Sequence, residues 1–128
     1  MIVLDTDVLI EIFDKESKKG ERAFGHVDES GEDISITSIN LHEILYGLKK
    51  SDNPTEEVLK LPVLDYTKRD ARTATTLELK AEQKGKPTRR TDAMIAAVAV
   101  NNGEKLYTFD KNHFEPLESE GLSLFHPD

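Results

Sequence analysis

The chain has 128 residues, with 17 Lys and Arg against 25 Asp and Glu, and a formal net charge of −8 at pH 7. This length suits one domain, expected to span residues 1–128, and the lack of cysteine excludes a disulfide framework, a thiolate zinc site and a cysteine nucleophile. Because the longest apolar run, Ala93–Val100, is too short for a membrane span and no signal peptide precedes Asp5, we expect a cytoplasmic protein without a membrane partner. The acidic balance taken alone argues against a nucleic-acid partner.

Short apolar runs, typical of buried strands, alternate with amphipathic segments, typical of helices. The expected elements up to residue 60 are, in chain order, a strand at Met1–Leu4, helices at Val8–Asp14 and Ser17–Asp28, a strand at Ile34–Thr37, and helices at Leu41–Lys50 and Asn53–Lys60. Ser17 is a typical helix N-cap. Apolar side chains at 41, 44, 45 and 48 form one helical stripe.

The rest of the chain continues this alternation. Its expected elements are a strand at Pro62–Leu64, helices at Thr67–Lys84 and Asp92–Asn102, and strands at Leu106–Phe109 and Leu122–Phe125. Thr67 and Asp70 fit a capping arrangement, and Gly85 and Gly103 each close a helix. Strands that alternate with helices predict an α/β fold, a parallel sheet of about five strands covered by helices on both faces.

Four acidic residues from distant parts of the chain are expected at one edge of this sheet. Asp5 and Asp110 directly follow predicted strands, while Glu43 and Asp92 lie near the start of helices that leave the same edge. Open parallel sheets bind ligands at the carboxyl ends of their strands. Two carboxylates about 4 Å apart repel by roughly 4 kcal/mol at an effective dielectric of 20, so the cluster favours a cation. Oxygen ligands alone select Mg²⁺ or Mn²⁺.

Structural roles also fit these residues one by one. An aspartate at a strand end is commonly a helix cap, and Asp7 is either the better cap of the first helix or an additional ligand. Asp92 also suits the dipole of its helix. A basic span directly before Asp92, with Lys84, Lys86, Arg89 and Arg90, either positions phosphates or forms an ordinary solvated helix end.

Four segments, in this order and in a chain of this length, resemble the PIN domain family, and the similarity is strongest to the small VapC-like ribonuclease toxins. The segments are Met1–Ile10, Ile36–Gly47, Thr91–Ala97 and Leu106–Phe114. The resemblance implies a PIN-like α/β fold and an endoribonuclease that uses one or two Mg²⁺ or Mn²⁺ ions to hydrolyse RNA with a metal-activated water. It also implies a homodimer and an antitoxin protein from an adjacent gene.

Residue roles follow from the same resemblance. By motif, the catalytic and metal-binding acids would be Asp5, Glu43, Asp92 and Asp110, and the supporting residues would be Thr6, Asp7 and Thr108. Lys86, Arg89 and Arg90 would be candidate substrate-binding residues. Asp7 stands where many members carry Asn, Ser or Thr, and Asp110 where many carry Asn, which leaves the number of metal ions open.

Two other functions fit the same residues. An Asp-x-Asp sequence after an apolar strand also begins the haloacid dehalogenase-type phosphatases, in which Asp5 would be the nucleophile and Asp7 the general acid. Such a phosphatase also needs a late acidic pair, which Asp110 alone does not supply. A non-catalytic RNA- or protein-binding module of the PIN type would keep the acids without cleaving anything.

Overall fold

The computed structural model describes residues 1–127 and contains a five-stranded sheet in the order β3-β2-β1-β4-β5. The strands are β1 (Ile2–Leu4), β2 (Ile34–Thr37), β3 (Val63–Leu64), β4 (Lys105–Tyr107) and β5 (Ser123–Leu124). Every neighbouring pair is parallel, and Val3 of the central strand lies opposite both Ser35 and Leu106. The prediction of a parallel α/β sheet is therefore confirmed.

Helices connect these strands and agree with most of the expected segments. They are α1 (Thr6–Leu9), the π-helix η1 (Ile10–Asp14), α2 (Lys18–Ser30), α3 (Ser38–Lys50), α4 (Glu56–Leu59), α5 (Lys68–Gln83), α6 (Arg90–Asn101), α7 (Lys111–Phe114) and the 3-10 helix η2 (Glu115–Glu120). The last two elements were not expected from the apolar pattern. None of the helices within residues 1–127 is long and apolar enough to cross a membrane.

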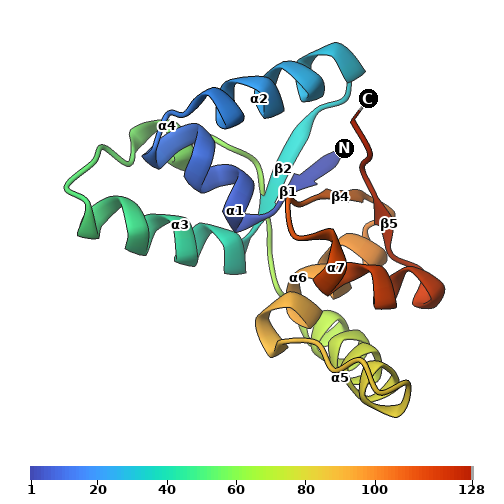
Figure 1. The fold of residues 1–128 in the computed structure, drawn as a ribbon. Helices are drawn as coiled ribbons and strands as arrows, with labels where there is room; N and C mark the ends of the chain where they lie inside the picture. The colour runs from blue at the N-terminus through green and yellow to red at the C-terminus, as the bar shows by residue number, and fades with distance from the viewer. Residues whose placement is uncertain (128) are drawn as a thin grey trace.

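Both faces of the sheet are covered, with α1 to α4 on one side and α5 to α7 on the other (Figure 1). Side chains of a strand alternate between the two faces, and β1 shows this directly. Ile2 and Leu4 pack with α1, α2 and α3, whereas Val3 packs with α5 and α6. Since β1 is buried on both faces, the residue that directly follows it in the chain is held in a fixed position.

Local sequence signals explain where the helices begin and end. The Ser17 hydroxyl accepts a hydrogen bond from Gly20 N at 3.0 Å, so it caps α2 as expected. Thr67 and Asp70 form a reciprocal capping box at the start of α5. After α6, Gly103 adopts a φ of 65°, a left-handed conformation that glycine accepts without strain.

Three of the differences from the expectations bear on the acidic residues. β4 ends at Tyr107 rather than Phe109, so Asp110 does not directly follow the strand but precedes α7. The helix expected to open at Asp92 begins at Arg90, which places Asp92 within its first turn. Asp5, rather than Asp7, caps α1, because the Asp5 carboxylate accepts the Thr6 N–H at 2.8 Å.

Candidate active site

The strand order reverses between β1 and β4, because the chain leaves β3 at one edge of the sheet and returns to the middle. Such a reversal opens a crevice at the carboxyl ends of the two strands, where parallel sheets bind ligands. Asp5 follows β1, and Thr108 follows β4. The Thr108 hydroxyl donates a hydrogen bond to Asp5 Oδ2 at 2.8 Å, which ties the two strand ends together.

A cavity of about 330 Å³ lies at this point. Its lining residues are Asp5, Thr6, Asp7, Ile10, Glu43, Arg89, Thr91, Asp92 and Asp110. The four acids expected at one edge therefore share one cavity, as do Thr6 and Asp7, although they come from the start of α1, from α3, from α6 and from the loop before α7. Thr108 lies just below the lining, with 1% of its surface exposed.

Asp5 has the most perturbed carboxyl group of the cavity. Burial, with a smaller contribution from the nearby Asp7 carboxylate, raises its pKa to about 7, although hydrogen bonds from Thr108 and the Thr6 N–H oppose the rise. Asp5 is 7% exposed. A carboxyl group that is half protonated near neutral pH is buried where little solvates its charge, and the Asp7 carboxylate adds an excess of negative charge. A cation would relieve that excess.

Glu43 and Thr6 form a polar chain with a third residue, Asn40, which the sequence analysis did not single out. The Thr6 hydroxyl donates to Glu43 Oε1 at 2.7 Å, and Asn40 Nδ2 donates to Thr6 Oγ1 at 3.0 Å. Asn40 is fully buried and also forms a capping box with Thr37 at the start of α3. This box usually takes Glu or Gln in place of Asn40, so the sequence carried only a weak signal for it.

Asp7 is held mainly by the two residues that follow β4, Thr108 and Phe109. Its carboxylate accepts hydrogen bonds from the Phe109 N–H at 3.2 Å and from the Thr108 hydroxyl at 3.4 Å. Burial raises the pKa of Asp7, and these hydrogen bonds partly offset the rise. Thr108 thus supports both Asp5 and Asp7, and it also accepts the Asp110 N–H at 3.0 Å.

Arg89 is the cation of the cavity. Its Nε donates to Asp92 Oδ2 at 2.9 Å, and its terminal nitrogen lies 3.8 Å from Asp110 Oδ2. His113 Nδ1 lies 2.6 Å from the same Asp110 oxygen and 3.1 Å from the Arg89 terminal nitrogen. Arg89 therefore partly neutralises two of the acids, and its side chain remains 65% exposed.

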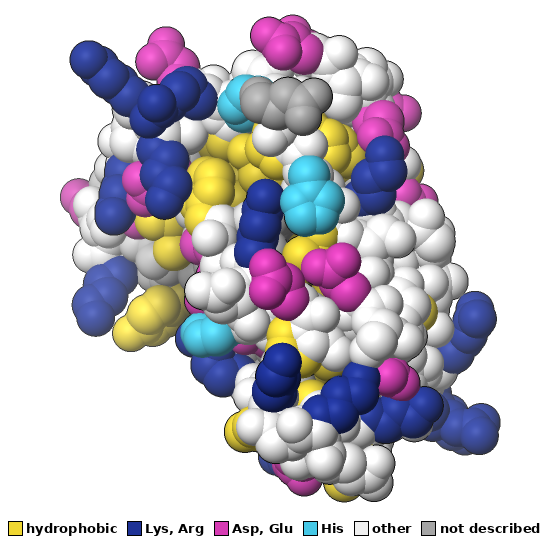
Figure 2. Space-filling model, turned by 45° about the vertical axis from the view of Figure 1, so that its right-hand side comes forward, with side chains coloured by type: hydrophobic (Ala, Val, Ile, Leu, Met, Phe, Trp, Pro, Cys, Tyr) yellow, Lys and Arg dark blue, Asp and Glu magenta, His cyan; other side chains and the backbone are white. Residues whose placement is uncertain are grey.

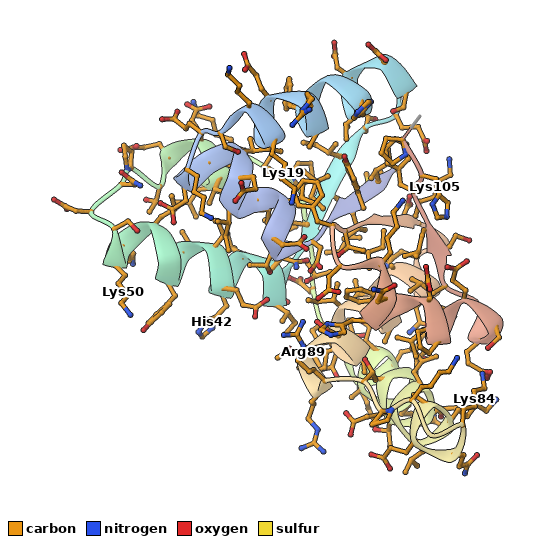
Figure 3. All side chains as sticks on the ribbon, viewed as in Figure 1. Lys19, His42, Lys50, Lys84, Arg89 and Lys105 are labelled. Atoms are coloured by element: carbon orange, nitrogen blue, oxygen red, sulfur yellow. The ribbon has the colours of Figure 1, made fainter. Side chains whose placement is uncertain are left out.

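The other two candidate substrate-binding residues lie outside the cavity. Arg90 pairs with Glu78 of α5 through two hydrogen bonds of 3.1 and 3.2 Å. Lys86 lines a separate surface depression beside His113 and Pro116. In Figure 3, Arg89 lies near the centre of the molecule, whereas Lys84, from the same basic span, lies at the far end of α5. The span is therefore not one continuous patch.

The donor set suits a hard divalent cation in chemistry, because the cavity offers carboxylate and hydroxyl oxygens and no sulfur. Within residues 1–127, however, no three His, Asp or Glu side chains converge closely enough to hold one ion directly. Arg89 lies between two of the acids instead. Metal binding here would therefore require Arg89 to move aside and the carboxylates to draw closer.

Comparisons with known proteins agree on one family. The PIN domain model matches residues 2–117. The VapBC2 complex from Rickettsia felis, solved with a DNA fragment from its promoter, contains a chain with 23% identity and a TM-score of 0.80, covering 100% of both chains. FitAcB from Neisseria gonorrhoeae gives 23% identity and 0.81 over 99% of this chain and 98% of that one.

DNA-bound VapBC from Salmonella typhimurium is similar as well, with 26% identity and a TM-score of 0.75 over 97% of this chain and 96% of that one. A comparison with curated protein sequences finds no match.

Proposed function

The chain belongs to the PIN domain family, and from that premise we propose that it is a Mg²⁺- or Mn²⁺-dependent endoribonuclease and the toxin of a VapBC-type toxin–antitoxin pair. The observation that carries this proposal is the convergence of Asp5, Glu43, Asp92 and Asp110 on one cavity at the strand-order reversal. The raised pKa of Asp5 adds support, because it marks a site that a cation would stabilise.

Asp5 and Asp92 are the proposed principal metal ligands, and Asp110 and Glu43 bind the ion directly or through water. When bound, a divalent cation neutralises charge on a phosphoryl group and lowers the pKa of water. Asp5 is positioned for this role by the cap of α1 and by Thr108, and Asp92 by the first turn of α6. The proposal takes one ion or two.

Glu43 is the proposed base. Its Oε1 is already occupied by the Thr6 hydroxyl, which leaves Oε2 to accept a proton from the attacking water. Asn40 holds Thr6 from the other side, so the carboxylate keeps one orientation. In-line attack on the phosphodiester would leave a 5′-phosphate and a 3′-hydroxyl.

Arg89 is the proposed phosphate-binding residue of the cavity. Its guanidinium is exposed and lies beside the acids, so it can exchange Asp92 for a phosphate oxygen when RNA enters. Lys86 and Arg90 can contact only RNA that extends beyond the cavity, because neither lines it. We keep them in the proposal as outer contacts.

The proposed partners are a second copy of this chain and an antitoxin encoded by an adjacent gene, in the cytoplasm where RNA is present. Large apolar side chains remain exposed on the helices and can seat such partners. They include Phe24 on α2, Tyr46 on α3, Leu59 on α4 and Leu79 on α5, each more than half exposed. The solved complexes named above are toxin-type chains with their partner proteins, which supports this assignment.

The test is cleavage of total cellular RNA by the purified chain with and without Mn²⁺, with the cut ends mapped. We expect cleavage that requires the metal and is abolished in D92N, while D28N, a change of the same kind on the exposed end of α2, cleaves normally. Full activity of D92N would contradict the site assignment. Metal binding without cleavage of any RNA would favour the non-catalytic module.

D7N separates this proposal from the phosphatase alternative. A phosphatase that uses Asp7 as its general acid would lose its activity in D7N. The proposed nuclease would be only weakened, because Asp7 mainly accepts hydrogen bonds from the Thr108 hydroxyl and the Phe109 N–H. Hydrolysis of a small phosphate monoester that disappears in D7N would overturn the nuclease proposal.

A further inference from the structure

A second and larger cavity, of about 660 Å³, lies along one face of α5 where the end of η2 approaches it. Lys68, Arg69, Arg72 and Lys80 line it together with a single carboxylate, Glu120. It shares no lining residue with the acidic cavity. This feature, called the α5 groove below, concentrates positive charge on a chain whose net charge is −8.

The one carboxylate of the α5 groove is already saturated by lysines. Lys80 and Lys84 each lie 3.0 Å from a Glu120 oxygen, and their hydrogen bonds lower the pKa of Glu120 to about 2. Glu120 therefore anchors η2 to α5 and does not neutralise the rest of the groove.

Three cations of the α5 groove form no ion pair, although Arg69 also borders a smaller depression with Asp65 and Asp70 and lowers the pKa of Asp70. Within residues 1–127, no ion pair reaches Lys68, Arg69 or Arg72, and all three side chains are exposed. Arg89 and Arg90, by contrast, each pair with an acid. Exposed, unpaired cations that share one groove form a site for an anion rather than part of an internal salt-bridge network.

The spacing of these cations suits an extended polyanion. Lys68 and Arg72 are four residues apart on α5, and Lys80 lies two further steps of four along the helix. Each step of four residues advances about 6 Å along a helix axis, so the charges form a row rather than a single pocket. No aromatic ring lines the groove, so contacts would go to phosphates and not to stacked bases.

The helix that carries the α5 groove packs against the helix that carries Asp92. α5 and α6 pack along each other, Glu78 of α5 binds Arg90 at the start of α6, and Asp92 follows two residues later. Figure 2 shows Lys and Arg side chains gathered at the lower right of the molecule, at the height of α5 in Figure 1. Glu78 itself does not line the groove, so this contact joins the two helices and defines no path for RNA between the two cavities.

We propose that the α5 groove binds the phosphate backbone of RNA, as a second contact outside the acidic cavity. The inference rests on the proposed function, because it takes RNA as the substrate of that cavity. On a chain with a net charge of −8, the unpaired cations of the groove therefore select a polyanion. Contacts to phosphates make this selection independent of base sequence.

The test is binding of a labelled, unstructured single-stranded RNA, measured by fluorescence anisotropy in EDTA over a range of salt concentrations. The variant is K68Q/R69Q/R72Q, and its matched control is K18Q/R22Q/K49Q, which removes three exposed cations from α2 and α3. Each lost phosphate contact on a single strand reduces the slope of log K against log salt by about 0.7, so we expect a reduction of about 2 in the variant only.

Equal slopes for the wild type and the groove variant would overturn the inference, as would an equal reduction in the control. Polyglutamate that binds as tightly as RNA, with the same dependence on the groove, would instead assign the groove to an acidic protein. Since EDTA removes metal-dependent cleavage, binding is scored apart from the nuclease assay. If the chain cleaves RNA but the groove variant has an unchanged salt slope, this inference alone is rejected. If the groove variant loses salt slope but the wild type cleaves no RNA, the proposed function alone is rejected.

Discussion

Arg89 and Asp92 form an ion pair of 2.9 Å inside the acidic cavity, between two residues of the same helix start. The guanidinium also lies within 3.8 Å of Asp110, so one flexible cation serves two of the proposed metal ligands. Arg89 therefore occupies, in charge and in position, part of the space that a divalent cation would take. The two cations should compete.

R89Q is expected to bind Mn²⁺ about fivefold more tightly than the wild type, because an ion pair that is partly exposed is worth about 1 kcal/mol. Calorimetric titration measures this without any RNA. R90Q is the matched control, since it removes the same charge one residue away but breaks only the pair with Glu78. Unchanged or weaker Mn²⁺ affinity in R89Q would show that Arg89 organises the acids for the metal instead.

The raised pKa of Asp5 makes the stability of the metal-free chain depend on pH. Because the folded state holds the proton more tightly than the unfolded state, the free energy of unfolding should fall as pH rises from about 4 to about 7. Between pH 5 and 7 the loss is about 2 kcal/mol. Carboxyl groups with lowered pKa, such as Glu120, titrate below this window and act in the opposite direction.

D5N should remove this dependence, since a neutral amide in place of the Asp5 carboxyl still caps α1 and still accepts from Thr108. Urea unfolding in EDTA at pH 5 and at pH 7 measures the effect, with D28N as the exposed control. We expect D5N to be the more stable protein at pH 7 and to lose Mn²⁺ binding. A wild-type chain equally stable at both pH values would refute the buried charge.

Much of the fold follows from local signals. The Ser17 cap, the Thr67 and Asp70 capping box and the alternating apolar runs are properties of a few neighbouring residues, and the sheet follows from their alternation. The convergence of Asp5 and Asp92 also follows, because parallel strands present their carboxyl ends to one edge.

The finer arrangement of the cavity depends on contacts between distant segments, which no local pattern specifies. Arg89 reaches Asp92 because α6 begins at Arg90, two residues earlier than its apolar stripe predicts. Consecutive residues of a helix point about 100° apart, so Arg90 turns to Glu78 although its neighbour faces the acids. The role of Asn40 depends on Thr6, which lies 34 residues away in sequence.

Thr108 is predicted to set the pKa of Asp5. T108V keeps the shape of the side chain but removes the hydroxyl that donates to Asp5 and Asp7 and accepts from the Asp110 N–H. We expect a loss of about 2 kcal/mol in unfolding free energy and an Asp5 pKa above the wild-type value, measured by NMR of the carboxyl carbon. T108S, which keeps the hydroxyl, should resemble the wild type. A T108V chain with an unchanged Asp5 pKa would exclude this role.

Gly20 allows a close contact between α2 and η1, the helix whose first residue lines the acidic cavity. α2 crosses the π-helix η1 so closely that a Cβ at Gly20 would overlap the carbonyl oxygen of Glu11. That carbonyl is fixed, because it accepts the Ser17 N–H at 3.0 Å. η1 follows α1 directly, and Ile10, its first residue, lines the acidic cavity. A shift of η1 would therefore displace part of the lining of the acidic cavity.

G20A should lower the unfolding free energy by about 2 kcal/mol, the cost of forcing extra volume into a packed contact, and should weaken Mn²⁺ binding as η1 moves. G25A is the control, since it lies on the same helix with nothing within 4 Å of its new methyl group. Alanine is a better helix former than glycine by about 1 kcal/mol, so G25A should be slightly stabilised. Thermal unfolding and Mn²⁺ titration of both variants measure the difference. If G20A were as stable as G25A, the close contact between α2 and η1 would be absent in solution.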